Sequence, residues 1–341
     1  MQPIDRQVLE QMREIDRILR AATGDMARTI RRYRMRHGMK AEFERVKPML
    51  RKQLLEVRRE LQEKIIKTLE KGTKDAWELA NRENDIMLKA YTKGQGVPKA
   101  LMASMQQVNI GALEAFLGRK SAGMSLSQNV WQLTQKYMGR IETYLGAGIT
   151  TGKSASRIAT DLKKYLKKPD ALFRRVRGAD GKLHLSKAAK AYHPGQGTYR
   201  SAYQNAKRLA ATETNMAYHL ADYERRQQLP FVTGIEVHVN PDGCEMCQAM
   251  AGKYPKDFVF TPFHPKCRCF TTDELLPEDK FQDYLNTGKV DGRYGIKTIP
   301  DKAQGWIGDN KERLIKTREA LKKKGGYAYW MESFDKDMEL V

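Results

Sequence analysis

Apolar residues near the start of the chain recur every three or four positions, which is the spacing of one face of an α-helix. These residues are Leu9, Met12, Ile15 and Leu19. Gly24 follows them and is expected to end the helix, because glycine is a common helix stop. The sequence therefore predicts a first helix that ends near residue 24.

A second and longer stripe predicts a helix from about Pro48 to Glu83, with a weak point at Gly72. Its apolar members are Leu54, Val57, Leu61, Ile65 and Leu69. Glu, Lys and Arg fill the other faces, where they form favourable pairs four residues apart. A stripe this narrow suits the packing of one helix on another, either within the chain or between copies.

Helix-start signals predict further helices in the middle of the chain. Pro98 can begin a helix that runs through Leu117, and Ser125 with Gln128 forms a capping box before the next one. A turn and a short helix then lead to Pro169, which stops that helix.

Residues 193–197 are expected to form a loop or linker, and a long helix is expected from about Tyr199 to Gln228 because Pro230 follows it.

Alternating apolar and polar residues appear only after this long helix. Ile235, Val237 and Val239 alternate with polar residues, which predicts a strand. Residues 257–263 and 267–272 are also expected to be extended. Earlier in the chain, the turn-rich stretch from Gly178 to Gly181 lies between two short extended runs and predicts a hairpin.

These patterns predict an α+β fold that is mostly α-helical, with long N-terminal helices followed by a small β-containing, cysteine-clustered core packed on a helix. Four segments are expected along the chain. They are an N-terminal helical region for docking to a partner (1–135), a helical turn with a basic hairpin connection (136–198), the cysteine-containing core (199–280) and a C-terminal tail (281–341).

The 341-residue chain is strongly basic, with 62 Lys and Arg against 41 Asp and Glu and a formal net charge of +21. Such a charge attracts polyanions, although a solvated helical surface that leans basic is the alternative. Residues 161–210 hold the densest excess, and we expect phosphate contacts from Lys163, Lys164, Arg174, Arg175 and Arg177. We predict no membrane span, because no apolar run approaches the required length of about 20 residues.

Catalytic signatures are weak. The stretch GAGITTGKS has Ala147 where a phosphate-binding P-loop requires glycine, and the residues before it look helical. The six histidines are scattered and form neither an HNH-like nor an HExxH-like group. We therefore expect that the protein is not an enzyme.

All four cysteines fall within one short segment, as Cys244, Cys247, Cys267 and Cys269. The CxxC spacing lets two thiolates face one ion, and residues two apart on a strand point to the same side. His264 is a fifth candidate, so the ligands would be the four cysteines or three of them with His264. A zinc ion held by four such ligands would be structural; disulfides and free buried thiols are the alternatives.

Several of these pieces occur in the order found in a known family. RLAATETNMAY on a predicted helix, then a strand, then CEMCQAMAGKYP and FTPFHPKCRC resemble the C-terminal core of the phage Mu F-like minor head proteins, also called phage head morphogenesis proteins. The resemblance covers about residues 140–272. It departs from the family at Ala211, where the family has arginine, and Arg208 lies one helical turn earlier.

The resemblance implies that Glu213 contacts the β core, paired with Arg208 or with backbone amides, and that Thr212 packs at the same junction. It also implies a minor head protein of a tailed phage, made in the host cytoplasm and located inside the virion head. Its expected partners are the portal protein, capsid or scaffold proteins, other copies of itself through helices, and double-stranded DNA bound nonspecifically. The alternative is a zinc-containing DNA-binding protein, possibly ejected with the genome.

Overall fold

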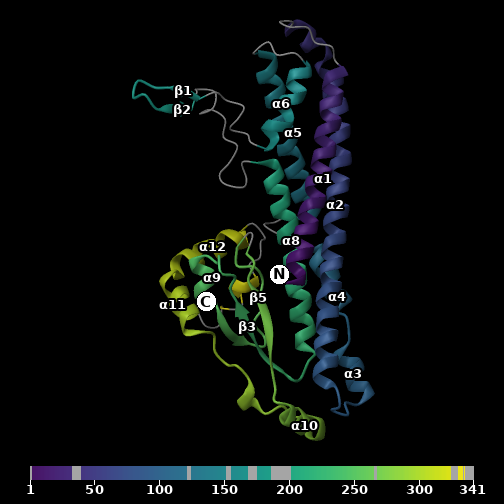
Figure 1. The fold of residues 1–341 in the computed structure, drawn as a ribbon, viewed down its shortest axis with the longest axis vertical. Helices are drawn as coiled ribbons and strands as arrows, with labels where there is room; N and C mark the ends of the chain where they lie inside the picture. The colour runs from purple at the N-terminus through teal and green to yellow at the C-terminus, as the bar shows by residue number, and fades with distance from the viewer. Residues whose placement is uncertain are drawn as a thin grey trace. The chain divides into compact units, whose positions relative to one another are not determined.

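The computed structural model describes residues 2–32, 40–120, 124–150, 155–167, 175–185, 201–264, 267–323, 329–332 and 334 (Figure 1). It is 71% helical and contains a small three-stranded antiparallel sheet, which confirms the predicted mostly helical α+β class. The chain forms two compact units. We call them the sheet unit (Met1–Val8, Glu70–Leu126 and Thr212–Val341) and the helical unit (Leu9–Leu69 and Ser127–Ala211).

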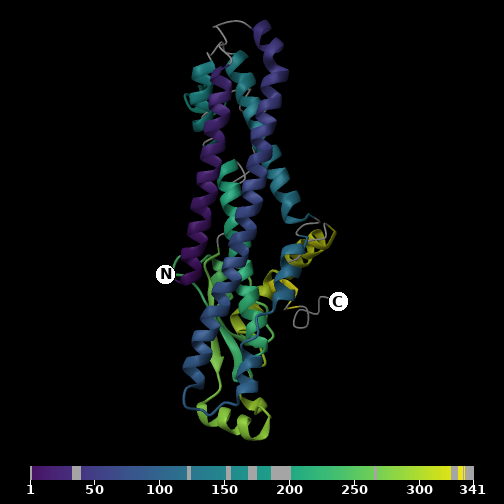
Figure 2. The ribbon, with the colours of Figure 1, turned by 90° about the vertical axis from the view of Figure 1, so that its right-hand side faces the viewer.

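Each unit takes residues from both sides of the predicted boundary at residue 135, because several long helices contribute residues to both units. Within the helical unit, helices lie alongside one another (Figure 2). They come from α1 (Pro3–Arg32), α2 (Lys40–Thr92), α5 (Leu126–Thr150), α6 (Ala155–Lys167) and α8 (Ala202–Gln227). No helix among the described residues has both the length and the apolar character needed to cross a bilayer.

The predicted stripe of α2 packs inside the chain. Leu54, Leu61, Ile65 and Leu69 are buried, and Val57 is half-buried. The helix end predicted at Gly24 is wrong, since α1 continues to Arg32, and α2 also continues through the weak point at Gly72. Glycine inside a helix costs about 1 kcal/mol relative to alanine, and burial of the neighbouring side chains on the same helices outweighs that cost.

A hydroxyl group in the helical unit joins three helices. Thr23 Oγ1 donates to Leu19 O at 2.7 Å and lies 2.7 Å from the hydroxyl oxygens of both Tyr137 and Tyr203. The Tyr203 hydroxyl also donates to Leu19 O at 3.1 Å. Burial raises the pKa of Tyr137 well above its ordinary value, so its hydroxyl stays protonated. The network satisfies buried polar groups that would otherwise oppose packing.

The single helix predicted from Pro98 to Leu117 is in fact two helices, α3 (Lys99–Met105) and α4 (Ile110–Gly118). Asn109 caps the second, because its side chain accepts a hydrogen bond from Ala112 N at 2.9 Å. The other helix starts agree more closely with the prediction. Helix α5 begins directly after Ser125, and α8 spans almost the expected range.

The sheet of the sheet unit has β3 (Val232–His238) in the centre, paired antiparallel with β4 (Gly252–Pro255) and β5 (Phe270–Leu275). Strand β3 was predicted, and its Ile235 and Val237 are buried as the alternation requires. The prediction of an extended strand over residues 257–263 is wrong, because this stretch is irregular. Both edges of β3 already have partners, and Phe258, Phe260 and Phe263 enter the core instead.

The predicted hairpin is present in the helical unit. Strands β1 (Arg175–Arg177) and β2 (Leu183–Leu185) pair antiparallel around the turn. Gly181 has φ of +73°, a conformation that glycine adopts without strain. The loop predicted at 193–197 lies outside the described residues.

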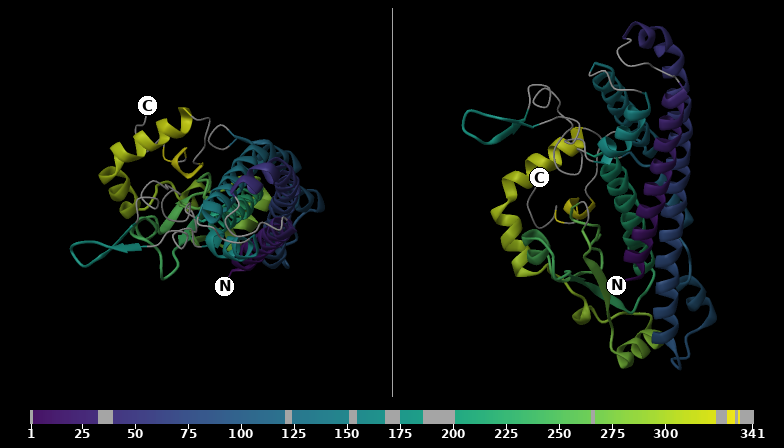
Figure 3. Two further views of the ribbon diagram at one scale, coloured as in Figure 1. Left: turned by 90° about the horizontal axis from the view of Figure 1, so that it is seen from above. Right: turned by 45° about the horizontal axis from the view of Figure 1, so that its top comes forward.

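C-terminal residues complete the core of the sheet unit (Figure 3). Ile299, Ile307, Leu314, Trp330 and Phe334 belong to the same apolar cluster as Ile235 and Val237 of β3. The elements involved follow α10 (Glu278–Thr287) and the short η3 (Gly292–Tyr294). They are α11 (Asp301–Asp309), α12 (Lys311–Lys323) and α13 (Tyr329–Glu332).

Replacing Thr23 with valine keeps the shape of the side chain but removes the hydroxyl that bonds Tyr137 and Tyr203. We expect Thr23→Val to lower the free energy of unfolding by about 1–3 kcal/mol, because a buried tyrosine hydroxyl loses a partner. Urea unfolding followed by circular dichroism measures this change.

The matched control is Thr143→Val in α5. Thr143 is exposed and also donates to the carbonyl four residues earlier, at 2.9 Å. We expect this control to change stability by less than about 0.5 kcal/mol, as exposed substitutions usually do. Equal effects of the two substitutions would contradict the role assigned to the buried hydroxyl network.

Candidate metal centre

The first two cysteines lie on a tight turn that ends in a short helix. Gly243 N donates to Asn240 O at 2.7 Å, and Cys244 caps α9 (Glu245–Ala249), which contains Cys247. A Cβ added at Gly243 would lie 2.3 Å from Val239 Cγ1, so only glycine fits this turn without rearrangement. The turn brings both thiols of the CxxC motif to one side.

The other candidate ligands lie in the irregular segment before β5. Cys267 N donates to His264 O at 3.0 Å, which closes a turn between the two residues. Cys267 and Cys269 precede β5 rather than lying within it, yet both are buried. Arg268 between them is exposed, and its guanidinium lies 3.4 Å from the Asp242 carboxylate.

The thiol and imidazole groups of the two segments lie close together. Cys244 Sγ lies 3.6 Å from Cys247 Sγ, and Cys247 Sγ lies 3.8 Å from Cys267 Sγ. His264 Nε2 lies 3.3 Å from Cys244 Sγ and 3.0 Å from Cys247 Sγ. The cluster could therefore bind a metal ion.

These separations match a metal site better than a disulfide. A tetrahedral ion with metal–sulfur bonds of about 2.3 Å holds its sulfurs about 3.8 Å apart. A disulfide requires about 2.05 Å between sulfurs, and all four cysteines are free thiols. No pair is at bonding distance, so the alternative of disulfides does not describe this arrangement.

Cys247 occupies the centre of the cluster. The candidate ligand atoms form two groups, one of Cys244, Cys247 and His264 and one of Cys247, Cys267 and Cys269, and within each group all atoms lie within 4.8 Å of one another. Any set of four ligands must draw on both groups. Cys247 is the residue that the groups share, so we expect it to be the ligand that matters most.

The thiols influence one another's ionisation. A hydrogen bond from Cys269 lowers the pKa of Cys267 to about 5, and the same bond raises the pKa of Cys269. Burial and the neighbouring Cys267 raise the pKa of Cys247 to about 12. Burial alone would raise the pKa of Cys244, but hydrogen bonds from Cys247 and the nearby His264 outweigh it and lower the pKa. A bound cation would favour the thiolate forms.

Helix α8 contacts the segment that bears Cys267. Asn215 Nδ2 donates to Cys267 O at 3.3 Å. Glu213, predicted to pair with Arg208 or backbone amides, instead has a partner that the sequence did not indicate, since its Oε2 lies 2.8 Å from Arg119 NH2. Thr212 and Arg208 are both half-buried, and the Arg208 guanidinium donates to Asn205.

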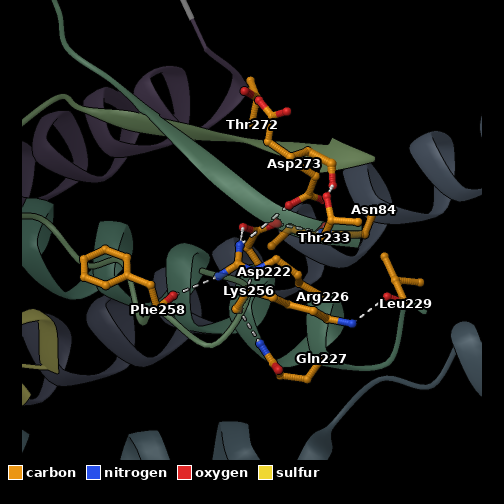
Figure 4. Close-up of polar contacts among 12 residues, drawn as sticks. Asn84, Asp222, Arg226, Gln227, Leu229, Thr233, Lys256, Phe258, Thr272 and Asp273 are labelled. Carbon is orange, nitrogen blue, oxygen red and sulfur yellow. Dashed lines mark hydrogen bonds and ion pairs between the residues drawn. The ribbon is translucent and has the colours of Figure 1, made fainter. Parts of the chain in front are cut away.

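A second set of contacts from α8, absent from the sequence prediction, centres on Arg226 (Figure 4). Its side chain is 1% exposed and forms an ion pair with Asp222 at 3.0 Å. It donates to Lys256 O at 3.4 Å and Phe258 O at 3.3 Å, and lies 3.7 Å from Asp273 of β5. Arg226 therefore holds the start of the same segment that carries His264 and Cys267.

Two charged side chains near Arg226 are buried enough for their pKa values to shift. Burial, with Asp222 nearby, raises the pKa of Asp273 to about 7. Burial and Arg226 lower the pKa of Lys256 to about 8, and its ammonium donates to Leu229 O at 2.7 Å. Perturbed groups of this kind mark functional sites or structural ion-pair networks, and the backbone partners here favour the structural use.

His219 is a further buried group that the sequence prediction did not include. It lies on α8 with its ring 4.6 Å from that of Phe260, edge to face. Burial lowers its pKa to about 4, so the imidazole stays neutral at physiological pH. Its ring packs in the apolar junction between α8 and the irregular segment.

The predicted phosphate-contact residues are described only in part. Lys164 on α6 and Arg177 on β1 are exposed. The side chains of Lys163 and Arg175, and the whole of Arg174, lie outside the described residues.

Comparison with known proteins gives no assignment: no family model, no curated protein and no solved structure matches this chain.

The geometry predicts a graded loss of metal across the cluster. Protein purified without chelator should hold about one metal ion per chain, measured by plasma emission spectrometry. Cys247→Ser should abolish binding because both groups of ligands lose a member. Cys244→Ser should weaken it, because one group stays intact. Glu245→Ser, an exposed change in the same helix, is the control and should retain the metal.

Full metal content in Cys247→Ser would contradict the assignment of Cys247 as the shared ligand.

The raised pKa of Asp273 predicts a pH-dependent stability. Because the folded pKa of about 7 lies above the ordinary value of 3.8, the folded state binds more protons than the unfolded state between these limits. Stability from this group is therefore present at low pH and is lost as pH rises through about 7. Urea unfolding from about pH 5 to pH 8 should show this loss relative to Asp273→Asn.

The variant should remove that part of the slope, and Asp279→Asn, an exposed change in α10, should leave it unchanged. Identical pH profiles for wild type and Asp273→Asn would contradict the shifted ionisation.

Proposed function

We propose that this chain is a structural minor head protein of a tailed phage, related to the Mu F-like head morphogenesis proteins, and that it has no catalytic role. The observation that carries the proposal is a convergence. Asn215 of the TETN stretch bonds to Cys267 of the HPKCRC stretch, and Cys267 Sγ lies 3.8 Å from Cys247 of the CxxC motif. The residues that carry the sequence resemblance thus form one connected junction.

Zinc is the metal that best fits this cluster. Thiolates and imidazole are its preferred ligands, and a closed four-ligand set is typical of structural zinc. The sulfur separations of 3.6 and 3.8 Å support tetrahedral coordination. Bound zinc would link the turn before α9 to the segment before β5, and would therefore stabilise the sheet unit.

The proposed location is the interior of the head, in association with the portal protein and near packaged DNA. Capsid or scaffold proteins and further copies of the chain are the other proposed partners. The excess of positive charge supports a position beside the genome, because packaged DNA is a dense polyanion. A structural zinc site also suits a non-catalytic protein that must keep its fold during assembly.

A tagged copy of the chain, produced during growth of the phage genome that encodes it, tests this role. We expect the tagged chain to co-sediment with assembled heads in a few copies each, and chemical crosslinking followed by mass spectrometry should join it to the portal protein. A tagged chain that carries Cys247→Ser should be depleted from heads, because the junction is destabilised.

Heads that assemble fully without the chain, together with no crosslink to any head protein, would contradict the proposed function. The zinc content of the purified chain is measured separately, so the metal site and the virion role can fail independently.

A further inference from the structure

The net positive charge of the chain is confined to one of the two units. The helical unit contains 34 Lys and Arg against 13 Asp and Glu, which gives +21. The sheet unit contains 28 of each and is electrically neutral. The whole formal charge of the chain therefore belongs to the helical unit, and the unit with the thiol cluster adds nothing to it.

Within the helical unit, two segments account for all of this excess. Residues 28–59 and 153–208 together contain 27 Lys and Arg against 6 Asp and Glu, which again gives +21. The first segment covers the end of α1 and the start of α2, and the second includes α6 and the beginning of α8. The remainder of the helical unit is neutral by the same count.

The described part of the first segment lies together with α6 of the second at one end of the helical unit. Arg31 NH2 donates to Thr160 Oγ1 at 3.4 Å, which joins the last turn of α1 to α6. Figures 1 and 2 both show α6 beside the final turns of α1 and close to the start of α2. Charges that are distant in sequence therefore combine into one surface, which we call the basic end.

The basic side chains at this end are accessible. Its exposed members are Arg28, Arg31, Arg32, Arg51, Lys52, Arg59, Arg157 and Lys164. Three of them form ion pairs, which are Arg28 with Asp25, Arg51 with Glu142 and Arg157 with Asp161. Ion pairs of such exposed arginines are weak. Arg32, Lys52, Arg59 and Lys164 form no ion pair with a described residue. These groups are available to an external anion.

The chemistry of the surface favours the phosphate backbone of a duplex. Arginine predominates, and its planar guanidinium binds phosphate in a bidentate manner. Binding of single strands generally relies on exposed aromatic rings that stack on the bases. Among the side chains that the structure describes in these two segments, none is an exposed Phe, Tyr or Trp; Tyr203 is 3% exposed.

We propose that the basic end of the helical unit binds double-stranded DNA through its phosphates, without sequence preference, and that the sheet unit takes no part in this binding. The proposal deepens the proposed location beside the genome by naming the contact surface. It is measured on the purified chain, so a failure of duplex binding and a failure of head association are separate results.

The test is fluorescence anisotropy with a short labelled DNA duplex and with one of its strands alone. The full-length chain is compared with a fourfold variant that carries Arg32→Gln, Lys52→Gln, Arg59→Gln and Lys164→Gln. The matched control removes four exposed charges from the sheet unit, as Lys302→Gln, Lys311→Gln, Lys316→Gln and Lys322→Gln. Circular dichroism checks that both variants keep the wild-type helix content.

We expect the wild type to bind the duplex more tightly than the single strand, with affinity falling steeply over about 50 to 200 mM salt. The fourfold variant should lose at least about tenfold in affinity and lower the salt slope by up to about 3.6, since each lost phosphate contact removes about 0.9. The control should bind as the wild type does.

Absence of duplex binding, equal weakening of the two variants, or tighter binding to the single strand would each overturn the proposal.

Discussion

The sheet unit depends on the way in which helix α8 holds the irregular segment between β4 and β5. The described residues of that segment pair with no strand, so their buried carbonyl groups need donors from elsewhere. Arg226 supplies them to Lys256 and Phe258, and Asn215 supplies one to Cys267. These contacts fix both ends of the segment on a single rigid helix, and the thiols of Cys247 and Cys267 can then meet.

Burial of a charge such as that of Arg226 is costly unless nearly every donor has a partner. Here Asp222, Asp273 and two carbonyl groups surround the guanidinium. The same crowding explains why the two carboxylates are not equivalent. Asp222 has the closer contact, whereas burial raises the pKa of the more distant Asp273 to about 7. The contacts that position the segment thus also produce its unusual ionisation.

The thiol cluster is part of an apolar core and does not substitute for one. Cys247, Cys267 and Cys269 pack in the same cluster as Tyr254, and C-terminal helices cover it. A β region of this size would by itself be too small to fold without a metal ion or a disulfide. The added helical residues make that region larger, so a metal ion would join two loops that a core already brings close.

Much of this arrangement could be predicted from local sequence signals. The alternation around Ile235 predicts β3 because its apolar face is buried, and the cysteine spacing indicates a shared site because i and i+3 thiols meet on a turn. The split between α3 and α4 also has a local signal, because Asn109 is a favoured helix cap. Continuation of α1 through Gly24 could not be predicted, because it depends on tertiary packing around Thr23 and Met26.

The buried role of Arg226 also had no local signal. It lies next to another arginine at the end of a helix, where charged side chains are usually solvated, and its partners come from β5 and from a segment without periodicity. Likewise, the pairing of Glu213 with Arg119 joins residues 94 positions apart. Long-range partners of this kind follow from the fold, and a single sequence does not specify them.

The claim on which the account depends is that the cysteines from two separate stretches surround a common metal ion. X-ray absorption spectroscopy of the zinc-loaded, full-length protein tests it most directly. The account predicts at least three sulfur ligands at about 2.3 Å from the zinc. A first shell made only of nitrogen and oxygen at about 2.0 to 2.1 Å would contradict it.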